Sequence, residues 1–133
     1  MNAPSVDIVD MLEAYGDSSG IDVEYADNLF IGQEPKIPIN SITIFDTGGS
    51  GLSFGLTGSG YEYTSIQIRV RNRKYIDGWN IIESIKVALH ARAQETWNGT
   101  LYSVIYCASG PALLDWDDNG NARFIINFNL QRR

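Results

Sequence analysis

Two segments with strand-like alternation flank a glycine-rich stretch, and this pattern constrains the fold more than any other feature. Residues 41–45 (SITIF) alternate polar and apolar side chains and are rich in β-branched residues, as is typical of a half-buried strand. Residues 61–73 repeat the alternation over a longer distance. Residues 46–60 between them form a long loop, and such a loop in a small domain is usually functional or disordered. The sequence therefore predicts two strands joined by a glycine-rich flap.

The rest of the chain predicts two helices and a C-terminal hairpin. Apolar residues at helical spacing indicate helices over residues 6–15 and 77–94, with Ser5 and Asp77 as capping residues. Asn119-Gly120 is the preferred pair for a tight hairpin. Further strands are expected at residues 23–25 or 29–31, 101–108, 112–116 and 122–130.

No strand–helix–strand unit repeats, so we expect an α+β fold. Its mainly antiparallel sheet would carry the two main helices on one face, with the long glycine-rich flap extending from it. A length of 133 residues suits one domain, 1–133, with one hydrophobic core.

Composition narrows the class of protein. A net charge of −6 argues against a general nucleic-acid binder. The single cysteine excludes an internal disulfide and favours a reducing compartment. No apolar run approaches membrane-spanning length, and the N-terminus lacks the pattern of a signal peptide. We expect a protein of the cytosolic type that does not enter a membrane.

The most conspicuous catalytic motif is Asp46-Thr47-Gly48, preceded by two apolar residues. It resembles the signature of aspartic proteases, in which two carboxylates share a proton. A chain with one such motif would have to dimerise, and it lacks the later apolar-apolar-Gly segment that those enzymes need. The alternative is a tight turn in which the Asp46 carboxylate accepts backbone hydrogen bonds. We favour this structural interpretation.

The glycine-rich stretch also invites a phosphate-binding interpretation. It lacks the Gly-Lys-Ser/Thr ending of a Walker loop, and a strand rather than a helix follows it. Leu52, Phe54 and Leu56 are large apolar residues that a solvated linker would not need. We hypothesise that they anchor the flap on another subunit.

Arg69, Arg71 and Arg73 form a basic stripe on one side of the second strand, spaced about 7 Å apart. Such a stripe can contact phosphates or the acidic surface of an identical subunit. On an acidic protein we favour the subunit contact, or a solvated sheet face, over nucleic acid.

No arrangement of nucleophile and base is convincing elsewhere in the chain. Residues 115–120 match the start of a calcium loop, but Ile126 stands where the bidentate acid is required, so we expect a hairpin turn there. We therefore expect no catalytic residue, no metal site and no cofactor.

Several motifs follow one another in a defined order: ITIFDTGG at residues 42–49, SIQIRVR at 65–71, Tyr75 with the helix at 79–89, and a strand containing Tyr106 before the Asn-Gly hairpin. In this order and spacing the chain resembles the tail terminator (minor capsid or tail completion) proteins of long-tailed bacteriophages. The resemblance extends from about residue 6 to the C-terminus.

The resemblance implies a structural virion protein, assembled in the host bacterial cytoplasm, that is not an enzyme. It would cap the finished tail tube as a ring, expected to be a hexamer, stop tube polymerisation and form the joint to head-completion or connector proteins. Its partners would be its own copies, the tail tube protein and the head-side protein, with DNA at most passing through the ring. The alternatives are another head–tail neck or tube component and, remotely, a dimeric aspartic protease using Asp46.

The resemblance also implies which residues take part in assembly. Asp46, Thr47, Gly48 and Gly49 correspond to the family's loop motif, and Gln67, Arg69 and Arg71 to its strand motif. Together with Leu52, Phe54, Leu56 and Arg73 they are the predicted subunit or partner interface.

Overall fold

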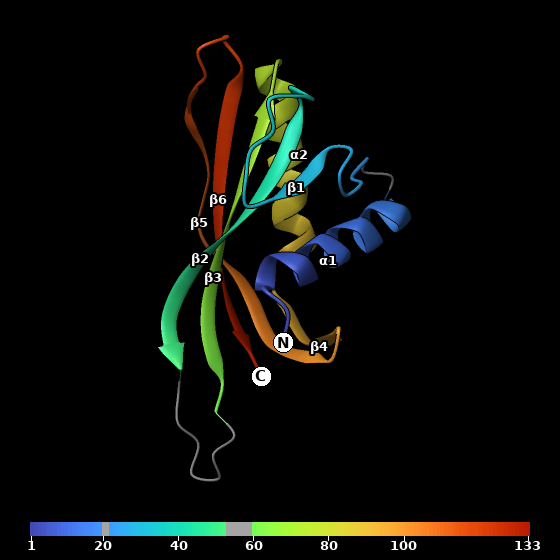
Figure 1. Cartoon of the computed structure of the whole chain (residues 1–133), viewed down its shortest axis with the longest axis vertical. Coiled ribbons are helices and arrows are strands. Elements are labelled where there is room, and N and C mark those ends of the chain that lie inside the picture. The colour runs from blue at the N-terminus through green and yellow to red at the C-terminus, as the bar shows by residue number, and fades with distance from the viewer. Residues whose placement is uncertain (20–21, 53–59) are drawn as a thin grey trace.

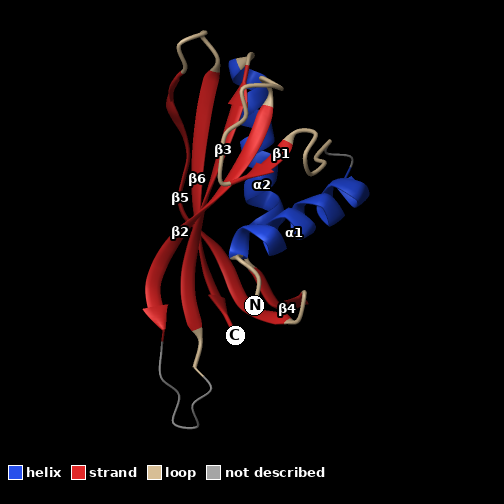
Figure 2. Cartoon of the chain, viewed as in Figure 1, coloured by secondary structure: helices blue, strands red, loops and turns tan. Residues whose placement is uncertain are grey.

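The computed structural model describes residues 1–19, 22–52 and 60–133, which form two helices and six strands (Figure 2). In chain order these are α1 (Pro4–Ser19), β1 (Leu29–Ile31), β2 (Ser41–Leu52), β3 (Glu62–Asn72), α2 (Tyr75–Leu89), β4 (Arg92–Trp97), β5 (Thr100–Trp116) and β6 (Ala122–Arg132). The strands form one sheet in the order β1-β2-β3-β6-β5-β4. Among the strand pairs of this sheet only β1 with β2 is parallel, and the others are antiparallel. The predicted α+β class is confirmed.

Both helices cover the same face of the long, twisted sheet (Figure 1). Burial alternates without a break from Thr64 to Asn72 and along β6, so every second side chain points into the core. The core between sheet and helices includes Ile8, Met11 and Leu12 of α1, Ile82, Ile85 and Leu89 of α2, Ile66, Ile68 and Val70 of β3, and Phe124, Ile126 and Phe128 of β6. Neither helix in the described part of the chain has the length and apolar character that a bilayer crossing requires.

The end of the second helix differs from the prediction. We expected it to run from residue 77 to residue 94, whereas α2 ends at Leu89 and residues 92–97 form β4. Asn98 and Gly99 both have positive φ, 51° and 80°, as a two-residue hairpin turn between β4 and β5 requires. The hairpin pairs Trp97 with Thr100, and this pairing overrides the helix-forming preference of the Ala-Arg-Ala-Gln segment at residues 91–94.

The strand before the flap also differs. We expected it to stop at residue 45, but β2 continues to Leu52, so residues 46–52 of the predicted flap belong to a strand. Register shifts between Asp46 and Gly48 and between Gly48 and Gly51 let the glycine-rich segment remain paired with β3. Residues 53–59 of the predicted flap lie outside the described residues.

The strand expected to break after residue 108 is continuous. β5 runs through Gly110 and Pro111 to Trp116, with register shifts against β6 that absorb the extra residues. The predicted turn at residues 117–121 is confirmed. There the Asp117 Oδ1 accepts the backbone N–H groups of Asn119 and Asn121, at 2.9 and 2.8 Å.

Candidate functional site

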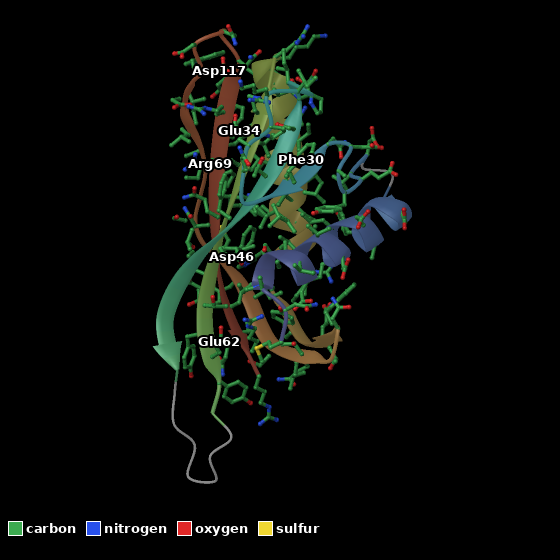
Figure 3. All side chains as sticks on the ribbon, in the orientation of Figure 1. Phe30, Glu34, Asp46, Glu62, Arg69 and Asp117 are labelled. Carbon is green, nitrogen blue, oxygen red and sulfur yellow. The ribbon has the colours of Figure 1, made fainter. Side chains whose placement is uncertain are left out.

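Asp46, the residue that drew attention to catalysis, binds the first turn of α1. Its Oδ1 accepts the backbone N–H of Ser5 at 3.0 Å, and its Oδ2 accepts the Ser5 hydroxyl at 2.6 Å. A carboxylate at this position satisfies an otherwise unpaired N–H of the helix and interacts favourably with the helix dipole. The predicted cap by Ser5 is therefore wrong: Ser5 lies inside α1, and the capping carboxylate comes from β2. Figure 3 shows Asp46 beside the start of α1.

The glycines after Asp46 serve the contact between β2 and β3. A Cβ at Gly49 would lie 2.5 Å from the carbonyl oxygen of Tyr63 and 2.6 Å from the Cα of Thr64. Gly48 has a φ of +78°, the left-handed conformation that a bulge of this kind favours. The Thr47-Gly48-Gly49 segment is thus a bulged, solvent-exposed strand rather than a phosphate cradle.

Arg71 is engaged within its own subunit. Its Nε donates to the carbonyl of Ile39 at 2.7 Å, and its Nη2 donates to the carbonyls of Pro35 and Pro38. Its Nη1 pairs with Glu34 at 2.9 Å, and the side chain is only 11% exposed. Arg71 therefore fastens the β1–β2 connection across the sheet face that the helices leave uncovered.

A second arginine extends this ion-pair group. Arg123 lies 3.4 Å from Glu34 and forms a bidentate pair with Asp115, with both N–O distances at 2.6 Å. Hydrogen bonds from the Arg123 guanidinium hold the pKa of the Asp115 carboxyl below its usual range. The same carboxylate raises the pKa of Arg123. The four charged side chains Arg71, Glu34, Arg123 and Asp115 therefore form one connected group, and Figure 3 labels Glu34 within it.

Arg69 belongs to a row of polar side chains that crosses the uncovered face. Its guanidinium lies 4.9 Å from the centre of the Phe45 ring, and its Nε donates to Gln67 at 2.9 Å. The row continues from Gln67 to Asn127 at 3.2 Å and from Asn127 to Ser109 at 2.9 Å. Strands β3, β6 and β5 are therefore linked side chain to side chain on this face.

Arg73 is the most exposed of the three arginines in the stripe. It follows the last residue of β3, its side chain is exposed, and its backbone N–H donates to Asn40 at 3.0 Å. The three predicted arginines therefore differ: Arg71 is largely buried, Arg69 is half-buried on the uncovered face, and Arg73 is exposed at the end of the strand. The predicted anchors Phe54 and Leu56 lie outside the described residues, as does the side chain of Leu52.

Each of the two edges of the sheet, here called its borders, is paired with a further strand over only part of its length within the described residues. β1 pairs with β2 from Ile42 to Ile44, and among the described residues no strand covers β2 from Phe45 to its end. β4 pairs with β5 from Thr100 to Ile105, and the described chain leaves the outer side of β5 without a strand beyond that point. Figure 1 shows the two free halves at opposite ends of the sheet.

The free half of β5 carries exposed apolar side chains. Leu113 and Leu114 are each 39% exposed, and Trp116 is 52% exposed. The Trp116 ring stacks on Tyr75 of α2 with centroids 6.0 Å apart, and Tyr75 itself is 41% exposed. Sequence reasoning missed this surface. The sequence did contain a signal for it, the mostly apolar run at residues 112–116. This run lies beyond the part of β5 that β4 covers.

These features define a small α+β protein in which Asp46, Arg71 and Arg123 bind groups of the same subunit and both sheet borders are only partly paired within the described residues. Comparison with known proteins gives the family. The sequence profile of the family described as "Bacteriophage tail terminator protein" matches residues 7–133, and the chain belongs to this family. It is therefore a structural protein of the phage tail and a component of the virion, which it builds together with other virion proteins.

The fold has a counterpart among solved structures. A chain of the structure titled "Virion of native gene transfer agent (GTA) particle" superposes with a TM-score of 0.72 at 9% sequence identity. The match covers 98% of this chain and 94% of that chain, so the folds agree over nearly their whole length. No curated protein sequence matches the chain.

Proposed function

We propose that this protein caps the assembled tail tube as a ring, ends tube polymerisation and forms the joint to the head-completion proteins. The observation that carries the proposal is the match to the tail terminator family, which spans residues 7–133. The ring is expected to be a hexamer that assembles in the host cytoplasm and lets DNA pass at most through its channel.

The structure supports a ring in a way that does not depend on the family. A ring of identical subunits needs two different contact surfaces on opposite sides of each subunit. The two half-covered borders of the sheet, on β2 and β5, have this arrangement. Unpaired strand edges can also pair with unwanted chains, and closure into a ring would remove this risk because each edge would be paired.

The predicted interface residues remain proposals, and their contacts within the subunit support a division among them. Within the same subunit, Asp46 accepts a hydrogen bond from Ser5 and Arg71 forms an ion pair with Glu34. Thr47, Gly48 and Gly49 lie exposed along the border of β2 and stay in the proposed interface. Arg73 is exposed, and Gln67 and Arg69 are half-buried on the uncovered face; these three remain candidates for contacts across the ring or toward its channel. Leu52, Phe54 and Leu56 remain proposed anchors.

The experiment that tests the proposal is the length distribution of tails, measured by negative-stain electron microscopy with the gene intact, deleted and restored from a plasmid. A terminator predicts overlong tails of variable length, without heads, in the deletion and normal tails after restoration. Tails of normal length in the deletion would contradict the proposal. If these tails still lacked heads, a head-side neck protein would be the better assignment.

A further inference from the structure

The free halves of β2 and β5 start from the same row of the sheet and extend to opposite ends. The pairing registers join Asp46 to Ile66, Ile66 to Phe128, and Phe128 to Cys107. From this row the free half of β2 runs toward residue 52, and the free half of β5 runs toward residue 116. Each subunit thus has one open border at each end, on opposite sides of the sheet.

The two open borders have opposite chain direction. Three successive antiparallel pairings, β2 with β3, β3 with β6 and β6 with β5, separate them. A neighbouring subunit that keeps the same orientation of its sheet would therefore bring its β2 alongside β5 in the antiparallel sense. Head-to-tail contacts between identical subunits require this kind of match between two different surfaces.

Side-chain size at the two borders is complementary. Thr47, Gly48 and Gly49 are all small residues, so this part of β2 presents little side-chain bulk. The border of β5 has Leu113, Leu114 and Trp116, which are exposed in the single subunit. Large apolar side chains can cover a strand of small residues closely, and central apolar or aromatic anchors supply most of the energy of an interface.

The β5 border is also protected against indiscriminate pairing. Pro111 has no N–H to donate, and register shifts against β6 fall between Cys107 and Ser109, between Ser109 and Ala112, and between Leu113 and Asp115. Bulges and prolines are devices that keep open strands from pairing with arbitrary partners. The contact must therefore be short and must draw on side chains as well as on the backbone.

We propose that the free half of β5, centred on Leu113, Leu114 and Trp116, binds the free half of β2 on the next subunit. The occupant of this surface is a second copy of the chain, and the two strands run antiparallel. The inference rests on the proposed ring and names the joint that closes it. Because the two open borders lie at opposite ends of the sheet, neighbours are displaced along the strands, which then incline to the ring axis as in closed barrels.

The test is disulfide crosslinking in tails, in a background without the native thiol. Cys107→Ser removes the only cysteine. Thr47→Cys is then combined with a cysteine on the β5 border, at Ala108, Ala112 or Leu114 in three separate double variants. All four positions are exposed, so the substitutions spare the core. Each variant replaces the wild-type gene, and isolated tails are oxidised and examined on non-reducing gels.

We expect at least one of the three pairs to give a ladder of covalent oligomers that ends at the ring. The single-cysteine variants should stay monomeric, because a head-to-tail contact does not bring a residue against its own copy. Thr47→Cys with Thr96→Cys tests the outer side of β4 as the alternative neighbour of β2. Ladders from that pair alone, or no ladder from any β5 pair, would overturn the inference.

Tail length in the same preparations separates this result from the proposed function. Tails of normal length without any β5 crosslink would refute the joint while leaving the terminator role in place. A gene whose deletion leaves tail length unchanged would remove the terminator role itself, whatever the crosslinking pattern.

Discussion

The carboxylate of Asp46 in β2 caps the first turn of α1 through Ser5, at 3.0 Å to the backbone nitrogen and 2.6 Å to the hydroxyl oxygen. The two residues are 41 positions apart in sequence. This contact joins the middle of the sheet to the N-terminal helix, and it gives the aspartate of the Asp-Thr-Gly motif a structural role.

Loss of this cap should lower stability. Asp46→Ala removes both acceptors of the Ser5 groups, and we expect the free energy of unfolding to fall by about 1 kcal/mol, as for other helix caps. Thr47→Ala, at the exposed neighbouring position, is the control and should change it by less than about 0.5 kcal/mol. Urea unfolding followed by circular dichroism measures both. Equal stability of Asp46→Ala and the wild type would show that the cap contributes nothing.

The ion pairs on the uncovered face should matter far more than those on the helix surface. Glu34→Gln leaves the guanidinium groups of Arg71 and Arg123 near each other without their shared carboxylate. We expect a loss of about 2 kcal/mol, less than for a fully buried pair. Glu83→Gln makes the same substitution in the exposed pair with Lys86, at 2.8 Å, and should cost less than about 0.5 kcal/mol. Similar losses in the two variants, measured by urea unfolding, would contradict the assigned role of Glu34.

Gly49 should not tolerate a side chain. A Cβ there would lie 2.5 Å from the Tyr63 carbonyl oxygen, and the backbone atoms that it meets cannot rotate away. We expect Gly49→Ala to destabilise the protein by about 1 to 3 kcal/mol, in the range of other overpacked sites. The measurement is the melting temperature of Gly49→Ala, compared with those of the wild type and of the Thr47→Ala control. An unchanged melting temperature would mean that β2 and β3 separate readily at this point.

The pair of Asp115 with Arg123 predicts a pH dependence of stability. The folded-state pKa of Asp115 is depressed, so its contribution is present above the unfolded pKa of about 3.9 and is lost as the pH falls through the folded value. The stability difference between the wild type and Asp115→Asn should therefore shrink as the pH is lowered from about 5 to about 3. Urea unfolding across this range measures it, with Asp118→Asn in the exposed turn as the control. A difference that stays constant with pH would exclude the ion pair as its source.

Tail assembly should depend on the apolar border of β5. Leu114→Asp places a charge on that border, and we expect fewer capped tails while the free energy of unfolding stays within about 0.5 kcal/mol of the wild type. Val87→Asp makes the same kind of change on α2, where the side chain is 66% exposed, and should leave assembly intact. Electron microscopy measures the fraction of capped tails in both variants. Normal assembly in Leu114→Asp would argue against the proposed joint.

The strictly alternating strands could be predicted from sequence because one face of each is buried. β3 and β6 bury every second residue over most of their length, and this burial requires the period of two that the sequence displays. α2 was predicted for a similar reason, since Ile82, Ile85 and Leu89 follow the helical period.

The missed features depend on partners outside the segment in which they occur. Arg92, Ala93 and Gln94 are residue types that favour a helix, and the pairing of Arg92 and Ala93 with β5 places them in a strand instead. The Asn98-Gly99 pair was the local signal for that hairpin. The partner of Asp46 in α1 left no local signal, and neither did the partner of Arg71 in the β1–β2 connection. The sequence could therefore indicate that Asp46 and Arg71 matter but not which groups they bind.

The most direct test of the account is a cryo-electron microscopy reconstruction of the head-proximal end of isolated tails. The account predicts one closed ring of copies of this fold at that end, with β5 of each subunit beside β2 of the next. Copies stacked along the whole tube would make the protein a tube component and contradict the account. A tube end without this fold would contradict it as well.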